Sequence, residues 1–146
     1  MTDSASTAVP LSQPLYGASL GQAVSRFFSK YATFSGRASR SEYWWVVLFI
    51  ALVNLVFSIL FAVLGGKYTP DSDGMIHIEG VAVVIVVIWG LFGLAILIPH
   101  IALTVRRLHD ANFAGWFYLF TVFGLGLVTF ILTLLPSKPE GARFDK

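Results

Sequence analysis

Three long apolar runs alternate with short polar segments along this chain of 146 residues. The runs cover about 43–64, 81–105 and 115–135, and none of them contains Asp, Glu, Lys or Arg. A helix needs about 20 apolar residues to cross the hydrocarbon core of a bilayer. The pattern therefore predicts an all-α membrane protein with three transmembrane helices over these ranges.

A shorter segment before the first run, about 20–34, has a different pattern. Apolar residues recur at helical spacing on one face: Leu20, Val24, Phe27, Phe28 and Tyr31. Polar residues, including Arg26 and Lys30, occupy the other face. This composition is typical of an amphipathic helix lying in the membrane interface. An ordinary helix packed on a protein core is the alternative, but no soluble core remains elsewhere in the chain.

The rest of the chain is polar. Residues 1–19 are rich in Ser, Thr, Ala and Pro, which predicts a disordered leader rather than a secretory signal. Residues 20–136 are expected to form a single membrane domain, and 137–146 an irregular polar tail. The loop 65–80 carries Lys67 among acidic residues, with turn chemistry at 69–74 that favours a short hairpin. A calcium loop is excluded there, because Met75 and Ile76 occupy ligand and glycine positions.

Composition supports the membrane class. The chain is 56% hydrophobic and 12% charged, whereas a soluble domain has about 25% charged residues. The absence of cysteine excludes disulfides and thiolate chemistry.

Charged residues gather at the ends of two predicted spans. We name these residues the charged cluster: Arg37, Arg40, Glu42, Arg106, Arg107, His109 and Asp110. Ser39 and Glu42 have the spacing of a capping box that begins the first span. Asp110 stands three and four residues after the two arginines, so local ion pairs are available on a continuing helix. We expect a cross-helix ionic network whose remaining arginines bind lipid phosphates.

An enzymatic role is not predicted. His109 and Asp110 could form an acid–base pair, but adjacent residues on a helix do not face each other. No nucleophile, metal-ligand set or glycine-rich phosphate loop accompanies them. We therefore predict no catalytic residues, no metal and no cofactor.

Three polar residues lie inside the apolar runs and are candidates for intramembrane contacts: Asn54, Ser58 and His100. Asn54 and Ser58 belong to a stripe of small and polar residues, 51–62, that is expected to face another helix. Gly90 and Gly93 form a similar stripe in the second run. Asn54 is interpreted as a packing residue, with substrate binding as the alternative. His100 is either functional or a neutral histidine bonded to a carbonyl freed by Pro99 or to Asn54.

Basic residues also predict orientation. Four precede the first span and two follow the second, whereas the loop between them carries only Lys67. This distribution places the N-terminus and the charged cluster in the cytoplasm. With three spans, the tail with Lys138 and Arg143 would lie outside the cytoplasm, which conflicts with the rule that basic residues favour the cytoplasmic side.

The motif Phe34–Trp45, followed by Arg106–Asp110 and by Gly115-Trp116, resembles the DUF805 family, small bacterial inner-membrane proteins of the YhaH type. The ending departs from the family pattern, since Ala142 and Asp145 stand where Asn and Gly are usual. The resemblance implies a multi-span protein of the bacterial plasma (inner) membrane and brings no established activity.

Two classes of function follow. The first is a non-enzymatic membrane component that binds lipids, including anionic ones, or a partner protein or second copy of itself, through the charged cluster. The alternative is a small oligomeric transporter or channel. Nucleic acid is not an expected partner.

Overall fold

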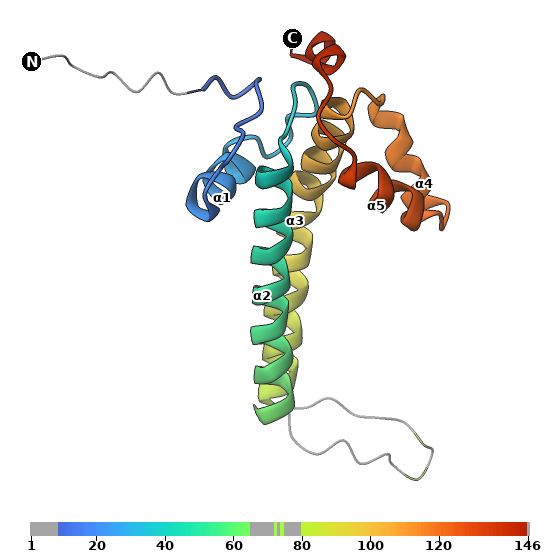
Figure 1. Cartoon of the computed structure of the whole chain (residues 1–146). Helices are drawn as coiled ribbons and strands as arrows, with labels where there is room; N and C mark the ends of the chain where they lie inside the picture. Colours follow the sequence, from blue (N-terminus) through green and yellow to red (C-terminus); the bar gives the residue numbers. More distant parts are fainter. Residues whose placement is uncertain (1–8, 65–71, 73, 75–79, 146) are drawn as a thin grey trace, which may run out of the picture. The chain divides into compact units, whose positions relative to one another are not determined.

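The computed structural model describes residues 9–64, 72, 74 and 80–145. Throughout the described residues the regular structure is helical, with no strand (Figure 1). In chain order the elements are α1 (Leu20–Ser29), α2 (Arg40–Leu64), α3 (Val81–Asp110), η1 (Gly115–Tyr118), α4 (Leu119–Val122), α5 (Gly126–Leu134) and η2 (Pro139–Phe144), where η marks a 3₁₀ helix. The prediction of an all-helical protein is confirmed.

Two of these helices are long and apolar enough to cross a membrane. They are α2 with 25 residues and α3 with 30 residues, at the positions of the first two predicted spans. Helix α2 begins at Arg40, as the predicted Ser39–Glu42 capping box indicates, and the predicted span 43–64 lies within it. The Ser39 amide donates to Glu42 at 2.9 Å, and the Glu42 amide donates to the Ser39 hydroxyl at 3.2 Å.

The predicted third span is corrected. Residues 115–135 do not form one helix. They form a hairpin, in which η1 and α4 make the first arm and α5 makes the second, and we name it the C-terminal hairpin. Gly124 reverses the chain with φ +81°, a conformation that favours glycine. Composition could not distinguish this hairpin from a span, because both are free of charge.

The chain divides into two compact units, which we describe separately. Unit 2, Val47–Leu97, contains the apolar parts of α2 and α3. The Trp89 indole donates to Asn54 Oδ1 at 2.8 Å, and Phe57 stacks on Trp89 with ring centroids 5.9 Å apart. Aromatic and amide contacts therefore join the two helices.

The predicted small-residue stripes do not make the close contacts of unit 2. Ala51, Ser58 and Ala62 are exposed. A β-carbon added at Gly90 or Gly93 would meet no atom within 4 Å. The large rings of Phe57 and Trp89 hold the helices together instead.

Unit 1, Met1–Val46 with Ile98–Lys146, contains the charged cluster. Its centre is the end of α3, where every residue from Ala102 to Ala111 is buried. The leader was predicted to be disordered, but within its residues 9–19 the Tyr16 hydroxyl donates to Asp110 at this centre and the Leu15 amide donates to Glu42. The tail was predicted to be irregular, but η2 docks there: the Lys138 amide donates to the Asp110 carbonyl at 2.8 Å.

The hairpin and turn predicted within 65–80 lie almost wholly outside the described residues. Of that loop only residues 72, 74 and 80 are described, and Gly74 and Gly80 have positive φ.

Replacing Gly141 with alanine tests the docking of the tail. The added β-carbon would overlap the carbonyl oxygen of His109, so Gly141→Ala is expected to cost about 1–3 kcal/mol of stability. Thermal unfolding in detergent measures the loss. The matched control is Gly90→Ala, where nothing lies within 4 Å and a helix prefers alanine. Equal melting temperatures for the two variants would show that the tail is not docked.

Candidate functional site

The two arginines at the end of α3 bind the ends of two other helices. Arg106 is 1% exposed, and its Nη1 donates to the carbonyls of Lys30 and Thr33, each at 3.0 Å. These carbonyls follow α1, whose last residue is Ser29. The last carbonyls of a helix have no partner inside it and carry partial negative charge. Lys30 is the C-cap residue of α1 and Thr33 lies in the turn beyond it, so Arg106 caps the turn that ends α1.

Arg107 caps α5 in the same way. It is fully buried, and its Nε donates to the Thr133 carbonyl at 3.0 Å while Nη2 donates to the Leu135 carbonyl. Its Nη1 forms the predicted local ion pair with Asp110 at 2.6 Å. One guanidinium thus holds α5 and a carboxylate at once. The predicted alternative pair, Arg106 with Asp110, is not formed.

Asp110 joins α3 to the leader and the tail. Besides Arg107, its carboxylate accepts hydrogen bonds from the Tyr16 hydroxyl at 3.1 Å and from the Ser137 hydroxyl. Burial raises the pKa of Tyr16, which keeps this hydroxyl protonated as a donor. The charge of Asp110 is therefore fully satisfied without access to solvent.

Glu42 pairs with a residue outside the predicted cluster. Its Oε1 lies 2.5 Å from Arg26 Nε, and its Oε2 accepts from the amides of Leu15 and Ser39, each at 2.9 Å. Arg26 also donates to leader carbonyls, at Val9, Pro10 and Gln13. Sequence analysis missed Arg26 because its helical position indicated only a polar face.

Arg37 binds the tail. It donates to both carboxylate oxygens of Asp145, at 2.8 and 2.6 Å, and these hydrogen bonds raise the pKa of Arg37. The Gly36 amide donates to the Phe144 carbonyl at 2.7 Å. Asp145 is therefore a structural partner of Arg37 in this chain.

His109 faces the tail as well, away from Asp110. Its Nδ1 lies 3.1 Å from the Gly36 carbonyl oxygen, and its ring stacks on Phe144 with centroids 4.0 Å apart. The two residues share no hydrogen bond in the described chain, so this geometry forms no acid–base dyad. No group of three His, Asp or Glu among the described residues could hold a metal ion.

Lys30 is buried in unit 1, contrary to the predicted polar face. Its side chain is 3% exposed, and its Nζ has no hydrogen-bond partner among the described residues. Burial lowers the pKa of Lys30 to about 8. Arg106 Nε is likewise unpartnered there. Burial of incompletely hydrogen-bonded charge is unfavourable, and at this site it falls on Lys30 and Arg106 and not on the exposed cations.

Arg40 is the one exposed member of the charged cluster and has no ion pair with a described residue. It begins α2 and lines a pocket of about 400 Å³ formed by Tyr16, Gly17, Ser39, Arg40, Ser41, Pro136 and Ser137. Arg106 and Arg107 are both buried in hydrogen bonds to protein, so Arg40 is the arginine of the charged cluster that is left exposed.

The predicted intramembrane polar residues are placed differently. In unit 2 the Asn54 amide donates to the Ile50 carbonyl and accepts from Trp89, while Ser58 donates to the Asn54 carbonyl. In unit 1 the His100 carbonyl accepts from the Thr104 hydroxyl. The His100 ring has no hydrogen-bond partner in the described part of the chain.

Removing the charge of Asp110 tests the buried network. Asp110→Asn leaves Arg107 without its carboxylate and is expected to lower the free energy of unfolding by about 3–5 kcal/mol. Denaturation in mild detergent measures the change. Arg40→Gln, at an exposed position, is the control and should change stability by no more than about 0.5 kcal/mol. A loss for Asp110→Asn as small as the control's would contradict the buried pair.

The pKa of Lys30 predicts a pH dependence. Between about pH 8 and the unfolded pKa of 10.5, the folded state binds fewer protons than the unfolded state. The free energy of unfolding should therefore rise as pH increases from 8 towards 9.5. Lys30→Met should flatten this rise, and Lys138→Met, at an exposed lysine, should keep it. Equal slopes for the two variants in denaturation series would exclude Lys30 as the cause.

Comparison with known proteins assigns the family. Residues 31–146 match the family described as "Protein of unknown function (DUF805)". Inner membrane protein YhaI of Escherichia coli (strain K12) is 31% identical over 114 residues, covering 77% of this chain and 82% of the relative. Inner membrane protein YhaH of the same strain is 28% identical over 121 residues, covering 82% and 89%. No solved structure matches. With most of its length matched, this chain belongs to the DUF805 family, whose relatives YhaI and YhaH are inner-membrane proteins.

Proposed function

We propose that this protein is a non-enzymatic inner-membrane component that binds the phosphate of anionic lipid headgroups at the Arg40 pocket. The observation that carries the proposal is the state of Arg40. It is exposed and free of ion pairs with described residues, whereas the other arginines of the charged cluster hold protein groups.

The chemistry of the pocket fits a phosphodiester. Arg40 is the first residue of the 25-residue α2, so the partial positive charge of the helix N-terminus adds to its guanidinium. A guanidinium matches two phosphate oxygens in fork geometry. The volume of about 400 Å³ lies within the range of small-molecule sites, roughly 300–1,000 Å³.

Helix α1 supports a position at the membrane surface. Leu20, Phe28 and Tyr31 are 39%, 45% and 41% exposed, while Phe27 is buried in unit 1. A helix that packs by one side and exposes apolar rings on another suits the boundary between headgroups and acyl chains. We propose that α1 lies in this interface, with Phe28 and Tyr31 towards lipid.

The distribution of charge supports one orientation. Nine of the ten Lys and Arg residues lie outside the segment between α2 and α3, which carries only Lys67. The tail is hydrogen bonded to the cluster, so Lys138 and Arg143 belong to the same side as Arg106. We propose two spans with both termini in the cytoplasm, which removes the conflict between the tail and the positive-inside rule.

The transporter alternative finds no specific support. A path through the membrane would need polar side chains free to bind a substrate, but both polar atoms of the Asn54 side chain are hydrogen bonded within unit 2. We therefore retain lipid binding alone.

Lipid protection tests the Arg40 pocket. Phosphatidylglycerol added to phosphatidylcholine micelles should raise the melting temperature of the wild type and raise that of Arg40→Gln less. Arg143→Gln, at another exposed arginine of unit 1, is the matched control and should keep full protection. Equal protection of Arg40→Gln and Arg143→Gln would exclude the pocket as the lipid site.

Reporter fusions test the orientation. A reporter inserted at Ser72, between α2 and α3, should be active only in the periplasm, because this segment has a single basic residue. A reporter after Lys146 should be active only in the cytoplasm. A periplasmic C-terminus would overturn the two-span topology.

A further inference from the structure

We propose that the C-terminal hairpin, Gly115–Leu134, inserts into a single leaflet of the bilayer, with acyl chains covering the surfaces that do not pack on α2 and α3. The inference depends on the membrane location of the protein and not on lipid binding at Arg40. Its starting point is exposure: Phe123, Leu127 and Val122 are 75%, 71% and 67% exposed, and no charged residue occurs from Phe113 to Leu135.

Exposed apolar side chains cover both arms of the hairpin as well as its tip. Trp116 and Leu119 are 59% and 48% exposed in the first arm, and Ile131 and Leu134 are 51% and 47% exposed in the second. A partner protein or a second copy would cover one face. A segment that exposes apolar side chains on both arms and at its tip suits hydrocarbon, which can cover several faces at once.

Both ends of the hairpin are fixed to the same part of unit 1. At the first end, a β-carbon on Gly115 would lie 2.6 Å from Val105 Cγ1, so the backbone packs directly on α3. At the second end, Arg107 binds the carbonyls of Thr133 and Leu135. The chain therefore leaves α3 and returns to it, and a crossing of the membrane between these points would separate them.

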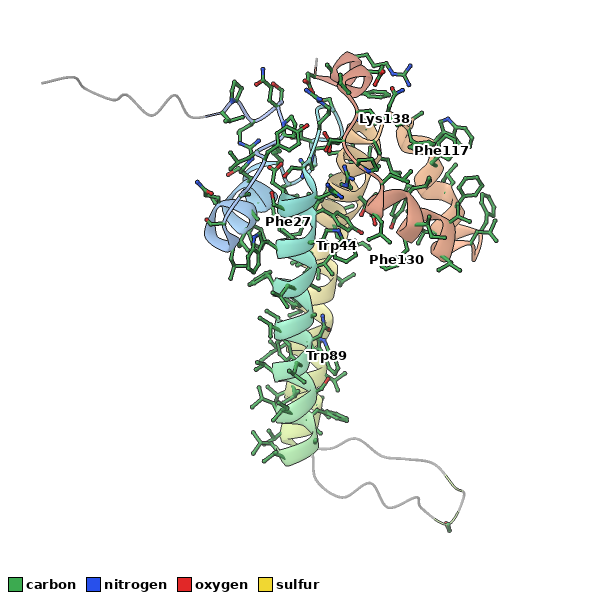
Figure 2. The ribbon with its side chains drawn as sticks, in the orientation of Figure 1. Phe27, Trp44, Trp89, Phe117, Phe130 and Lys138 are labelled. Carbon is green, nitrogen blue, oxygen red and sulfur yellow. The ribbon has the colours of Figure 1, made fainter. Side chains whose placement is uncertain are left out.

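The second arm contacts the beginning of α2. Figure 2 labels Trp44 and Phe130, whose rings meet edge to face with centroids 5.9 Å apart. Helix α5 has nine residues, about 14 Å at 1.5 Å per residue. The hydrocarbon of one leaflet is about 15 Å thick, half of the roughly 30 Å core. The arm fits one leaflet and is too short for two.

Polar groups at the turn of the hairpin form hydrogen bonds within the hairpin, which lipid could not supply. The amides of Phe123, Gly124 and Leu125 donate to carbonyls of α4, at Leu119, Thr121 and Phe120. The Thr121 hydroxyl donates to the Thr129 hydroxyl at 2.9 Å and links the two arms. Unpaired backbone groups in hydrocarbon cost several kcal/mol each, so this internal pairing makes insertion of the tip feasible.

Single-cysteine variants test the insertion, because the chain has no native cysteine. Phe123→Cys reports on the tip, and Ser35→Cys and Ala142→Cys report on exposed positions of unit 1 before and after the hairpin. Each variant is labelled with a membrane-impermeant maleimide in spheroplasts and in inverted membrane vesicles. A nitroxide at residue 123 in lipid nanodiscs then reports its accessibility to oxygen and to a water-soluble nickel chelate.

We expect positions 35 and 142 to react from one and the same side, and position 123 to react from neither. The nitroxide at position 123 should be accessible to oxygen. Its accessibility to the nickel chelate should be at least tenfold lower than that of a nitroxide at position 142. Reaction of 35 and 142 from opposite sides would overturn the proposal in favour of a third span. Maleimide reaction at 123, or shielding from both oxygen and nickel, would overturn it in favour of water or a protein partner. Reaction of 35 and 142 from the periplasmic side together would refute only the cytoplasmic orientation.

Discussion

Unit 1 is built around the burial of two adjacent arginines. Arg106 and Arg107 lie at the end of α3 with almost no exposed surface. A buried guanidinium is strongly unfavourable unless its donors find acceptors, and few side-chain carboxylates reach this position. The acceptors are mainly helix-end carbonyls, of α1 for Arg106 and of α5 for Arg107. Arg107 thereby satisfies its own donors and the end of α5, whereas Arg106 binds the turn after α1 and leaves its Nε without a partner among the described residues.

The charged residues of unit 1 therefore fall into two groups: those that pair with each other inside the protein and those that are available to a ligand. Glu42, Asp110 and Asp145 each neutralise one arginine within unit 1. Removing either member of such a pair leaves the other buried and uncompensated, which explains why these residues suit a scaffold better than a binding surface. Arg40 lies at the pocket outside this network, and the functional proposal therefore depends on a position whose loss leaves the fold intact.

Features with local causes could be predicted from the sequence. Three features depend on residues within one turn of each other: the helical spacing of apolar residues in α2 and α3, the Ser39–Glu42 capping box, and the ion pair of Arg107 with Asp110. Contacts between distant segments could not be predicted. Nothing in the sequence indicates that Arg26 meets Glu42 or that Arg37 meets Asp145. Lys30 stands on a polar face by spacing, yet it is buried in unit 1.

The prediction of a single helix over 115–135 was wrong for a related reason. Hydropathy measures how well a segment tolerates lipid, and a hairpin in one leaflet tolerates it as well as a helix across two. The features that decide between them are Gly124, the Thr121–Thr129 hydrogen bond and the carbonyls that Arg107 binds. Of these, only the contact of Arg107 with α5 joins segments far apart in the sequence.

Hydrogen exchange in lipid nanodiscs tests the role of the arginines most directly. If each guanidinium caps one helix, Arg107→Met should raise amide exchange in 126–135 and leave 20–33 close to wild type. Arg106→Met should show the reverse pattern. Faster exchange of the same segments in both variants, or unchanged exchange in both, would contradict the account.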